Sequence, residues 1–406
     1  MDIEKIRQDF PLLQTKHHGK PVIYFDNACQ TLRPWPVINA VTDYYQNYSA
    51  CGGRSMHRLG EKVTQECEEA RMAVARLINA KRKEEIIFTR NTTEGINLVA
   101  KSSGLKQGDA VLTTDKEHNS NLIPWQLAAS KSGIIHKIVP SNEDNTFNLE
   151  KMKEMMEDLQ DTIKLVSVVD TSNLDGVTNP VQKITELAHR YGAKVLLDAA
   201  QAVPHRKINV SGLDVDFLAF SGHKMLGPSG TGVLYGKYHL LEELEPFMAG
   251  GETVEYSTYE GHKLLPPPEK FEAGLQDYAG IIGLGEAVRY LKKIGFTDIA
   301  EQDYRLNKFI TDELMKIPQI KIIGPTHSAL RRGIISFYME GIESHELALI
   351  LDETANIMIR SGQHCVHSWF ASRGIQGSAR VSLYFYNTLE EAQLFIDSLK
   401  RICKLV

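Results

Sequence analysis

Residues 194–224 read KVLLDAAQAVPHRKINVSGLDVDFLAFSGHK, and this stretch decides the fold of the chain. Residues 195–197 and 215–220 form two apolar runs without polar alternation, which indicates strands buried on both faces of a parallel sheet. The first run ends in Asp198, and the second leads through Ser221 and His223 to Lys224. Ligands of open α/β sheets bind at the carboxyl ends of the strands. We therefore expect Asp198 and Lys224 to face one site.

An acid and a lysine in this position suit the cofactor pyridoxal 5'-phosphate (PLP). The lysine would bind the cofactor covalently, and the acid would keep the pyridine nitrogen protonated so that the ring accepts electrons. Taken singly, a strand-end aspartate is often a helix cap and a lysine after glycine is often solvated. The combination with Gln201, Ser221 and His223 favours the cofactor site.

The composition indicates a large, water-soluble chain. With 406 residues, 42% of them hydrophobic, it can bury a sizeable core and divide into two domains. The net charge of -5 is spread without long runs, which argues against a nucleic-acid surface. The N-terminus lacks the apolar core of a signal peptide, and no apolar run approaches about 18 residues. Five cysteines without a CxxC pair fit a reducing compartment, so we expect a cytoplasmic protein.

Strand and helix patterns alternate from residue 85 onward, which predicts a mostly parallel, seven-stranded-type α/β sheet covered by helices. The pattern changes near residue 290 to shorter strands mixed with long helices. We therefore predict a large domain over residues 16–289. Residues 1–15 and 290–406 would form a smaller α+β domain.

Three features of the large domain predict ligand contacts. Thr92 and Thr93 lie between a strand and a helix, where free N–H groups and hydroxyls favour an anion, although a simple threonine cap is the alternative. Ser221 and His223 would complete a phosphate site. His118 follows another strand and would stack on a flat ring and move protons, unless it is only a hydrogen-bonded loop residue.

Residues 360–367 read RSGQHCVH and form the second informative stretch. Cys365 lies between His364 and His367, which favours a nucleophilic thiol; a structural cysteine and a zinc site built from these three residues are the alternatives. Arg380 lies on an apolar strand and needs an anionic partner. That partner is either a substrate carboxylate or an internal acid.

The motifs of the chain resemble the class V aminotransferase-type PLP enzymes of fold type I, and specifically the group II (Suf-type) cysteine desulfurases. SGHK with the upstream DxxQ is typical of the class, and RSGQHC with the short interval from Cys365 to Arg380 is typical of the subgroup. The resemblance spans nearly the whole length. The motifs that carry it are TTEGINLVA (92–100), EHNSNLIPW (117–125), LDAAQAV (197–203), SGHKMLGPSGTGVLYG (221–236), FEAG (271–274), RSGQHC (360–365) and ARVSLYFYN (379–387).

The resemblance implies conversion of L-cysteine to L-alanine, with the sulfur held as a persulfide on Cys365 and passed to an acceptor protein for iron-sulfur cluster assembly. It also implies a homodimer whose sites lie at the subunit interface. The residues implied to act are, for catalysis, Lys224, Cys365 and His118; for PLP binding, Thr92, Thr93, His118, Asn173, Asp198, Gln201, Ser221, His223 and Lys224; and for substrate binding, Asn173, Arg360 and Arg380. No metal is implied.

Three positions depart from the family pattern. Leu275 stands where a threonine usually follows FEAG, residues 51–54 (CGGR) lack a usual histidine unless His57 replaces it, and Cys29 adds a thiol near the expected substrate. These departures leave other reactions open within the class, namely a selenocysteine lyase, a Cβ-lyase or an aminotransferase. A non-catalytic scaffold is the alternative from another class of function.

Overall fold

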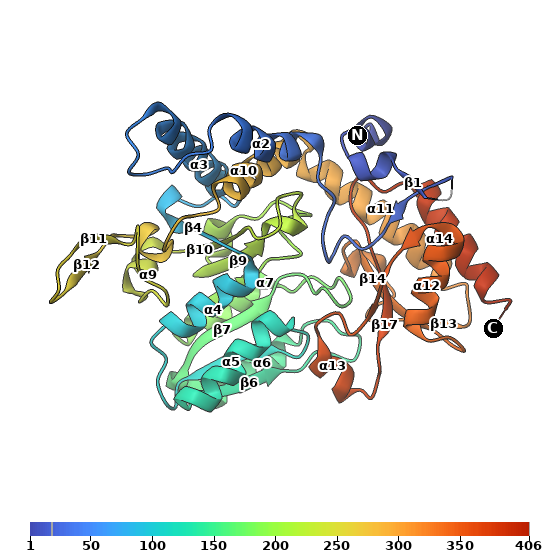
Figure 1. Cartoon of the computed structure of the whole chain (residues 1–406). Coiled ribbons are helices and arrows are strands. Elements are labelled where there is room, and N and C mark those ends of the chain that lie inside the picture. The colour runs from blue at the N-terminus through green and yellow to red at the C-terminus, as the bar shows by residue number, and fades with distance from the viewer. Residues whose placement is uncertain (18, 406) are drawn as a thin grey trace.

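A seven-stranded sheet with the order β4-β10-β9-β8-β7-β5-β6 forms the centre of the computed structural model, which describes residues 1–17 and 19–405 (Figure 1). Neighbouring strands run parallel except at β10, which is antiparallel to both β4 and β9. The predicted mostly parallel α/β sheet is thereby confirmed. The strands are β4 (Ile86–Thr89), β5 (Ala110–Thr114), β6 (Ile135–Val139), β7 (Ile163–Val169), β8 (Lys194–Asp198), β9 (Phe217–Ser221) and β10 (Gly232–Gly236).

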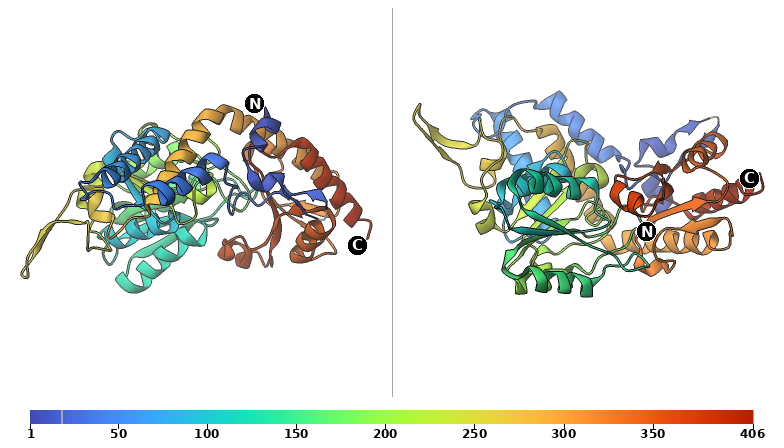
Figure 2. Two further views of the ribbon diagram at one scale, coloured as in Figure 1. Left: turned by 45° about the horizontal axis from the view of Figure 1, so that its top comes forward. Right: turned by 90° about the horizontal axis from the view of Figure 1, so that it is seen from below.

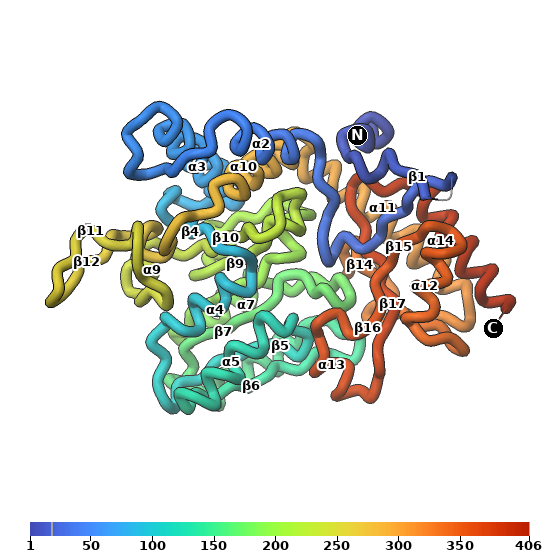
Figure 3. The backbone as a smooth tube through the Cα atoms, in the orientation of Figure 1, coloured from blue at the N-terminus to red at the C-terminus, as the bar shows by residue number. Residues whose placement is uncertain are grey.

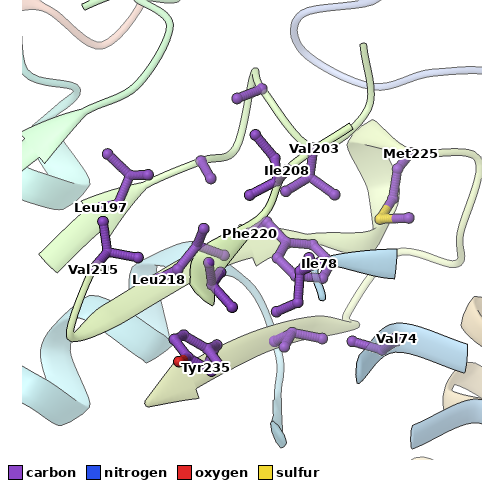
Figure 4. Packing of buried hydrophobic residues seen from close by; sticks show 14 of the residues in the cluster. Val74, Ile78, Leu197, Val203, Ile208, Val215, Leu218, Phe220, Met225 and Tyr235 are labelled. Atoms are coloured by element: carbon purple, nitrogen blue, oxygen red, sulfur yellow. The ribbon is translucent and has the colours of Figure 1, made fainter. Parts of the chain in front are cut away.

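Helices cover both faces of this sheet, which explains why its strands are apolar throughout. Leu197 and Phe220 pack with α3 and α10 in one core, whereas Leu196 and Ala219 point to the other face and pack with α4 and α5. Figure 4 shows Val74 and other residues of the first core close together. The helices of this part are α2 (Trp35–Asn47), α3 (Arg58–Leu77), α4 (Thr92–Ser102), α5 (Asn119–Ser132), α6 (Leu149–Leu159), α7 (Val181–Arg190) and α10 (Tyr278–Ile294).

A second, antiparallel sheet with the order β13-β14-β17-β16 lies in the C-terminal part of the chain. Its apolar side chains form a separate core with those of three helices. The elements are β13 (Ile320–Ile322), β14 (Ile334–Met339), β16 (Arg360–Gly362), β17 (Ser378–Ser382), α11 (Phe296–Leu314), α12 (Ser344–Ala355) and α14 (Leu389–Ile402). The division into domains at residue 290 stays a prediction, because α10 continues through that position.

The N-terminal segment crosses to this second sheet, as Figure 3 shows. Strand β3 (Ile23–Tyr24) pairs in parallel with β15 (Ile357–Met358), and Asp26 forms a bridge with Ser382 of β17. This pairing places residues 26–29 between the two sheets. The remaining short elements are α1 (Ile3–Arg7), α8 (Val210–Leu213), α9 (Tyr238–Glu243), α13 (His367–Ser372), β1 (Lys16–His17), β2 (Lys20–Pro21), β11 (Val254–Ser257) and β12 (His262–Leu264).

The hairpin of β11 and β12 projects from the body of the molecule in both views of Figure 2. Its side chains are largely exposed, including Tyr256 and Tyr259. Among the helices that the structure describes, none has both the length and the apolar character needed to span a bilayer.

Glu272, within the FEAG segment, ties the loop after the hairpin to the edge of the large sheet. Its carboxylate accepts two hydrogen bonds from the Arg71 guanidinium, at 2.8 and 2.9 Å, and one from the Phe88 N–H of β4 at 2.7 Å. Both side chains are buried. Removing one member of a buried ion pair destabilises a protein strongly, because the remaining charge stays out of water without its partner.

Replacing Glu272 with alanine should therefore lower the free energy of unfolding by about 3 kcal/mol, since Arg71 would stay buried and keep only the half-exposed Glu68, 3.3 Å away, as an acidic partner. Denaturant-induced unfolding curves of the two proteins measure the difference. The matched control is Asp312→Ala, which removes the exposed pair with Lys308 on α11 and should leave the curve almost unchanged. Equal effects of the two substitutions would contradict this account of Glu272.

Candidate active site

One cavity of about 230 Å³ lies between the carboxyl ends of the large sheet's strands and the second sheet. Strands β7, β8 and β9, the first turns of α4 and α5, and the segment from β16 to β17 all contribute to its wall. Every residue that the sequence placed in the site lines this cavity: Thr92, Thr93, His118, Asn173, Asp198, Gln201, Ser221, His223, Lys224, Arg360, Cys365 and Arg380.

Asp198 and Lys224 interact electrostatically at the floor of the cavity. Asp198 ends β8, is 3% exposed, and accepts a hydrogen bond from the Ala200 N–H at 3.0 Å. Burial raises the pKa of Asp198 and lowers the pKa of Lys224, and the attraction between them partly offsets both changes. Gly222 precedes this lysine by two residues because a Cβ there would overlap Thr231 Oγ1. The SGHK turn thus needs its glycine for packing.

The start of α4 forms a cluster of N–H and hydroxyl groups. Asn91, not a threonine, caps the helix, since its side chain accepts from the Glu94 N–H. The Thr92 N–H and hydroxyl lie 2.9 and 2.6 Å from Ser221 Oγ, and the Thr93 hydroxyl pairs with another serine of α5. Both threonines line the cavity at this helix terminus. This arrangement suits an anion, because the helix dipole adds to the donors.

Two histidines of the cavity are neutral at physiological pH. His118 Nδ1 accepts a hydrogen bond from the Ser120 N–H at 3.0 Å, which caps α5. Burial and then the positive charges of Lys224 and Arg380 lower the pKa of His118 to about 3. Burial likewise lowers the pKa of His223 to about 4. Both rings can therefore accept or relay a proton but do not carry a resting charge.

Glu117 is a buried acid directly before His118 in the chain, and the sequence interpretation gave it no role. Its carboxylate accepts hydrogen bonds from the Thr114 N–H and hydroxyl, the Asn121 amide and the Val169 N–H of β7. Burial raises the pKa of Glu117 to about 7, whereas these donors favour the ionised form. The contacts fix the loop after β5 to the end of β7. The sequence signal that could have identified Glu117 is its position just after β5 and next to His118.

The backbone around Cys365 is held in an unusual conformation. His364 and Cys365 have φ angles of 50° and 59°, which non-glycine residues rarely adopt. The Asn119 N–H donates to the Cys365 carbonyl and the Asn173 amide donates to the His364 carbonyl, both at 2.7 Å. His364 Nε2 lies 2.8 Å from Ser378 Oγ, and burial lowers the pKa of His364 to about 2. His364 therefore places no cation beside the thiol.

The alternative of a zinc site has no support in this geometry. Within residues 1–17 and 19–405, no group of three or more His, Cys, Asp or Glu side chains is arranged to hold a metal ion. His367 Nδ1 instead lies 2.9 Å from the Asn119 amide nitrogen.

Two arginines share a carboxylate that the sequence interpretation missed. Asp26 lies 3.4 Å from Arg380 and 3.5 Å from Arg360. Arg380 also donates to the Asn173 carbonyl at 2.9 Å, and Arg360 Nη1 lies 2.9 Å from Cys29 Sγ. Burial raises the pKa of Asp26, and the two guanidiniums oppose that shift. Because two cations face one acid, this wall of the cavity carries spare positive charge, which suits an anionic ligand.

The other departures from the family pattern lie outside the cavity. Leu275 is 74% exposed, so its side chain contacts little of this chain. His57 caps α3, where its Nδ1 accepts from the Gly60 N–H at 3.2 Å. The Cys51 thiol is exposed and lies 3.7 Å from the Tyr278 hydroxyl.

The neutrality of His118 leads to a pH prediction. Between pH values of about 6.5 and 3, the unfolded chain binds a proton at this ring and the folded chain does not, so unfolding is favoured as the pH falls. The free energy of unfolding should therefore decrease through this window, and less steeply in His118→Phe. Imidazole ¹⁵N spectra should show a neutral His118 ring at pH 5. A ring that is charged at that pH in the folded protein would contradict the assignment.

Comparison with known proteins agrees with the resemblance seen in the motifs. The chain matches the family described as Aminotransferase class-V over residues 23–395. A probable cysteine desulfurase of Synechocystis sp. is 42% identical over 399 residues, covering 97% of this chain and 94% of that relative. The apo structure of a cysteine desulfurase from Thermococcus onnurineus NA1 has a TM-score of 0.94 at 38% identity, covering 99% of this chain and 98% of that one. A cysteine desulfurase structure from Escherichia coli has a TM-score of 0.91 at 30% identity, covering 100% and 99%. The chain belongs to the aminotransferase class-V family.

Proposed function

We propose that this protein is a PLP-dependent cysteine desulfurase that converts L-cysteine to L-alanine and holds the sulfur as a persulfide on Cys365. The observation that carries the proposal is a single cavity lined by the buried Asp198, by Lys224, by the Cys365 thiol and by two arginines that share one acid. Relatives that bear the name cysteine desulfurase over nearly the whole chain support it.

The cavity fits PLP because it contains buried polar atoms that need a partner. Gln201 Oε1, Asn173 Oδ1 and Arg380 Nε are buried and make no hydrogen bond within the part of the chain that the structure describes. The residues that would hold PLP are Lys224 at the aldehyde, Asp198 at the pyridine nitrogen, Gln201 at the ring hydroxyl, His118 and Asn173 at the ring, and Thr92, Thr93, Ser221 and His223 at the phosphate. Bound PLP supplies an electron sink for the charge left when an amino acid loses its Cα proton.

Lys224 would move the proton at the substrate Cα. Burial lowers the pKa of its amine, so a larger fraction is neutral and able to accept a proton than at an exposed lysine. Asp198 lies in a fixed position at the end of β8, and its carboxylate would keep the pyridine nitrogen of PLP protonated. His118 is neutral and caps α5. It would stack on the pyridine ring of PLP and relay protons without adding a positive charge.

Arg380 and Arg360 would bind the substrate carboxylate. Arg380 is almost fully buried and is oriented by its hydrogen bond to the Asn173 carbonyl, so its fork is preorganised. Arg360 lies nearer the surface, with a side chain that is 42% exposed. An incoming carboxylate would compete with Asp26 for these two guanidiniums and would use the spare positive charge of this wall.

Cys365 would then take the sulfur. Its thiolate attacks the substrate sulfur, the bond from that sulfur to Cβ breaks, and the new S–S bond leaves a persulfide on the protein. Protonation of the remaining three-carbon fragment gives alanine. We further infer from the family resemblance that the protein acts as a cytoplasmic homodimer and passes its persulfide sulfur to an acceptor protein for iron-sulfur cluster assembly.

Replacing Cys365 with serine tests this proposal. The Cys365→Ser holoenzyme should keep its PLP absorbance and still change its spectrum on addition of L-cysteine, because the groups around Lys224 are intact. It should form alanine at least about a hundredfold more slowly, since a hydroxyl scarcely ionises at neutral pH. Alanine is measured after a fixed incubation with L-cysteine and a reductant.

The control is Cys403→Ser, which changes a thiol beside Met339 in the second core. It should retain the full rate of alanine formation. Unimpaired alanine formation in Cys365→Ser would overturn the desulfurase assignment and leave a lyase or an aminotransferase of the same class.

A further inference from the structure

The cavity contains two cysteines, and the proposed function uses only Cys365. Cys29 lines the same cavity of about 230 Å³, although 335 residues of sequence lie between them. Three other thiols lie elsewhere: Cys51 is exposed beside Tyr278, Cys67 packs on the main core, and Cys403 contacts the second core. The site therefore holds a dithiol pair drawn from both ends of the chain.

The backbone before Cys29 is fixed, so this thiol is not on a loose loop. The Ala28 N–H donates to Ser382 Oγ at 2.9 Å, and the Ala28 carbonyl accepts from the Gln201 amide at 2.7 Å. The Cys29 N–H donates to the Asp26 carbonyl at 3.1 Å. These bonds anchor the segment to both sheets and hold Cys29 at the wall of the cavity.

A guanidinium lies directly against the Cys29 sulfur. Arg360 Nη1 is 2.9 Å from Sγ, so the guanidinium donates a hydrogen bond to this sulfur. The Arg360 cation interacts electrostatically with both Cys29 and Cys365, and so does Lys224. Negative charge on either sulfur therefore faces the same two cations. An anionic sulfur can pass from one cysteine to the other without leaving this electrostatic environment.

We propose that Cys29 is a second sulfur-carrying residue, which receives the sulfur from the Cys365 persulfide inside the cavity. The inference rests on the proposed desulfurase function and extends it to a second site of modification. Cys29 Sγ attacks the outer sulfur of the Cys365 persulfide and forms a new S–S bond. The S–S bond to Cys365 breaks, and Cys365 leaves as a thiolate that takes up the proton lost by Cys29. No electron enters or leaves the pair, so the step needs no oxidant or reductant.

The transfer has a measurable consequence for stoichiometry. Once Cys365 is a thiol again, it accepts sulfur from a second molecule of L-cysteine. Each subunit then stores two sulfur atoms when no acceptor is present.

The experiment is a rapid-quench burst of the PLP-loaded enzyme with L-cysteine, without reductant or acceptor protein. Wild type should form two equivalents of alanine per subunit in the burst, and Cys29→Ala and Cys29→Ser should each form one. Cys51→Ala, which removes the exposed thiol outside the cavity, is the matched control and should form two. A wild-type burst of one equivalent would overturn the relay.

Persulfide mapping of the quenched wild type gives a second readout that needs no substitution. Alkylated persulfide should appear at both Cys29 and Cys365. Trypsin leaves Cys29 and Cys51 in one peptide, because Lys20 and Arg33 each precede a proline. Fragment ions must therefore separate these two cysteines, whereas residues 361–373 form a peptide with one cysteine.

The outcomes distinguish the relay from the function on which it rests. Persulfide confined to Cys365 would overturn the relay and leave the desulfurase intact, whereas a wild type that forms no alanine would overturn both. In Cys365→Ser, Cys29 should stay unmodified. Persulfide on Cys29 in that variant would mean direct transfer from substrate, and a disulfide between the two cysteines with released sulfide would mean attack on the inner sulfur. Either result would contradict the relay.

Discussion

The burial of an acid and an amine at the ends of adjacent parallel strands is the constraint on which the rest of the structure depends. Moving each charge out of water costs several kcal/mol, and Asp198 and Lys224 recover part of that cost from each other. The remaining cost is tolerable only if the surroundings hold both groups in place and a ligand completes their contacts. The register that sets Asp198 opposite Ala219, and the glycine before His223, provide this support.

The second sheet contributes two guanidiniums and the Cys365 thiol to the cavity. Arg360 and Arg380 face each other across β16 and β17, and Asp26 arrives from the N-terminal segment to hold them both. The loop between these strands carries Cys365 in a left-handed backbone conformation, which is held by Asn119 at the start of α5 and by Asn173 after β7. Because the contacts cross between the sheets, the site exists only when both are assembled. The pairing of β3 with β15 helps to join them.

Sequence patterns predicted the strand-end residues well, because an apolar run followed by polar groups reports directly on a parallel sheet. Thr92, Asp198 and Lys224 lie where those runs placed them. The pattern could not reveal Asp26 as the partner of Arg380, since that contact joins positions 354 residues apart. Nor could it show that His364 is too buried to be charged, because burial depends on the packing of Ser378 and its neighbours. Local sequence patterns therefore identify the residues of the site, whereas tertiary packing determines the charge state and the contacts of each side chain.

The fate of L-cysteine tests the central claim most directly. The PLP-loaded protein is incubated with L-cysteine and an excess of a thiol reductant, and alanine, sulfide, pyruvate and ammonia are measured together. A desulfurase that carries sulfur on its own cysteines should release alanine and sulfide in equal amounts, with neither pyruvate nor ammonia. Sulfide accompanied by pyruvate and ammonia would instead show cleavage by a Cβ-lyase, and would contradict the assignment of Cys365 as the sulfur acceptor.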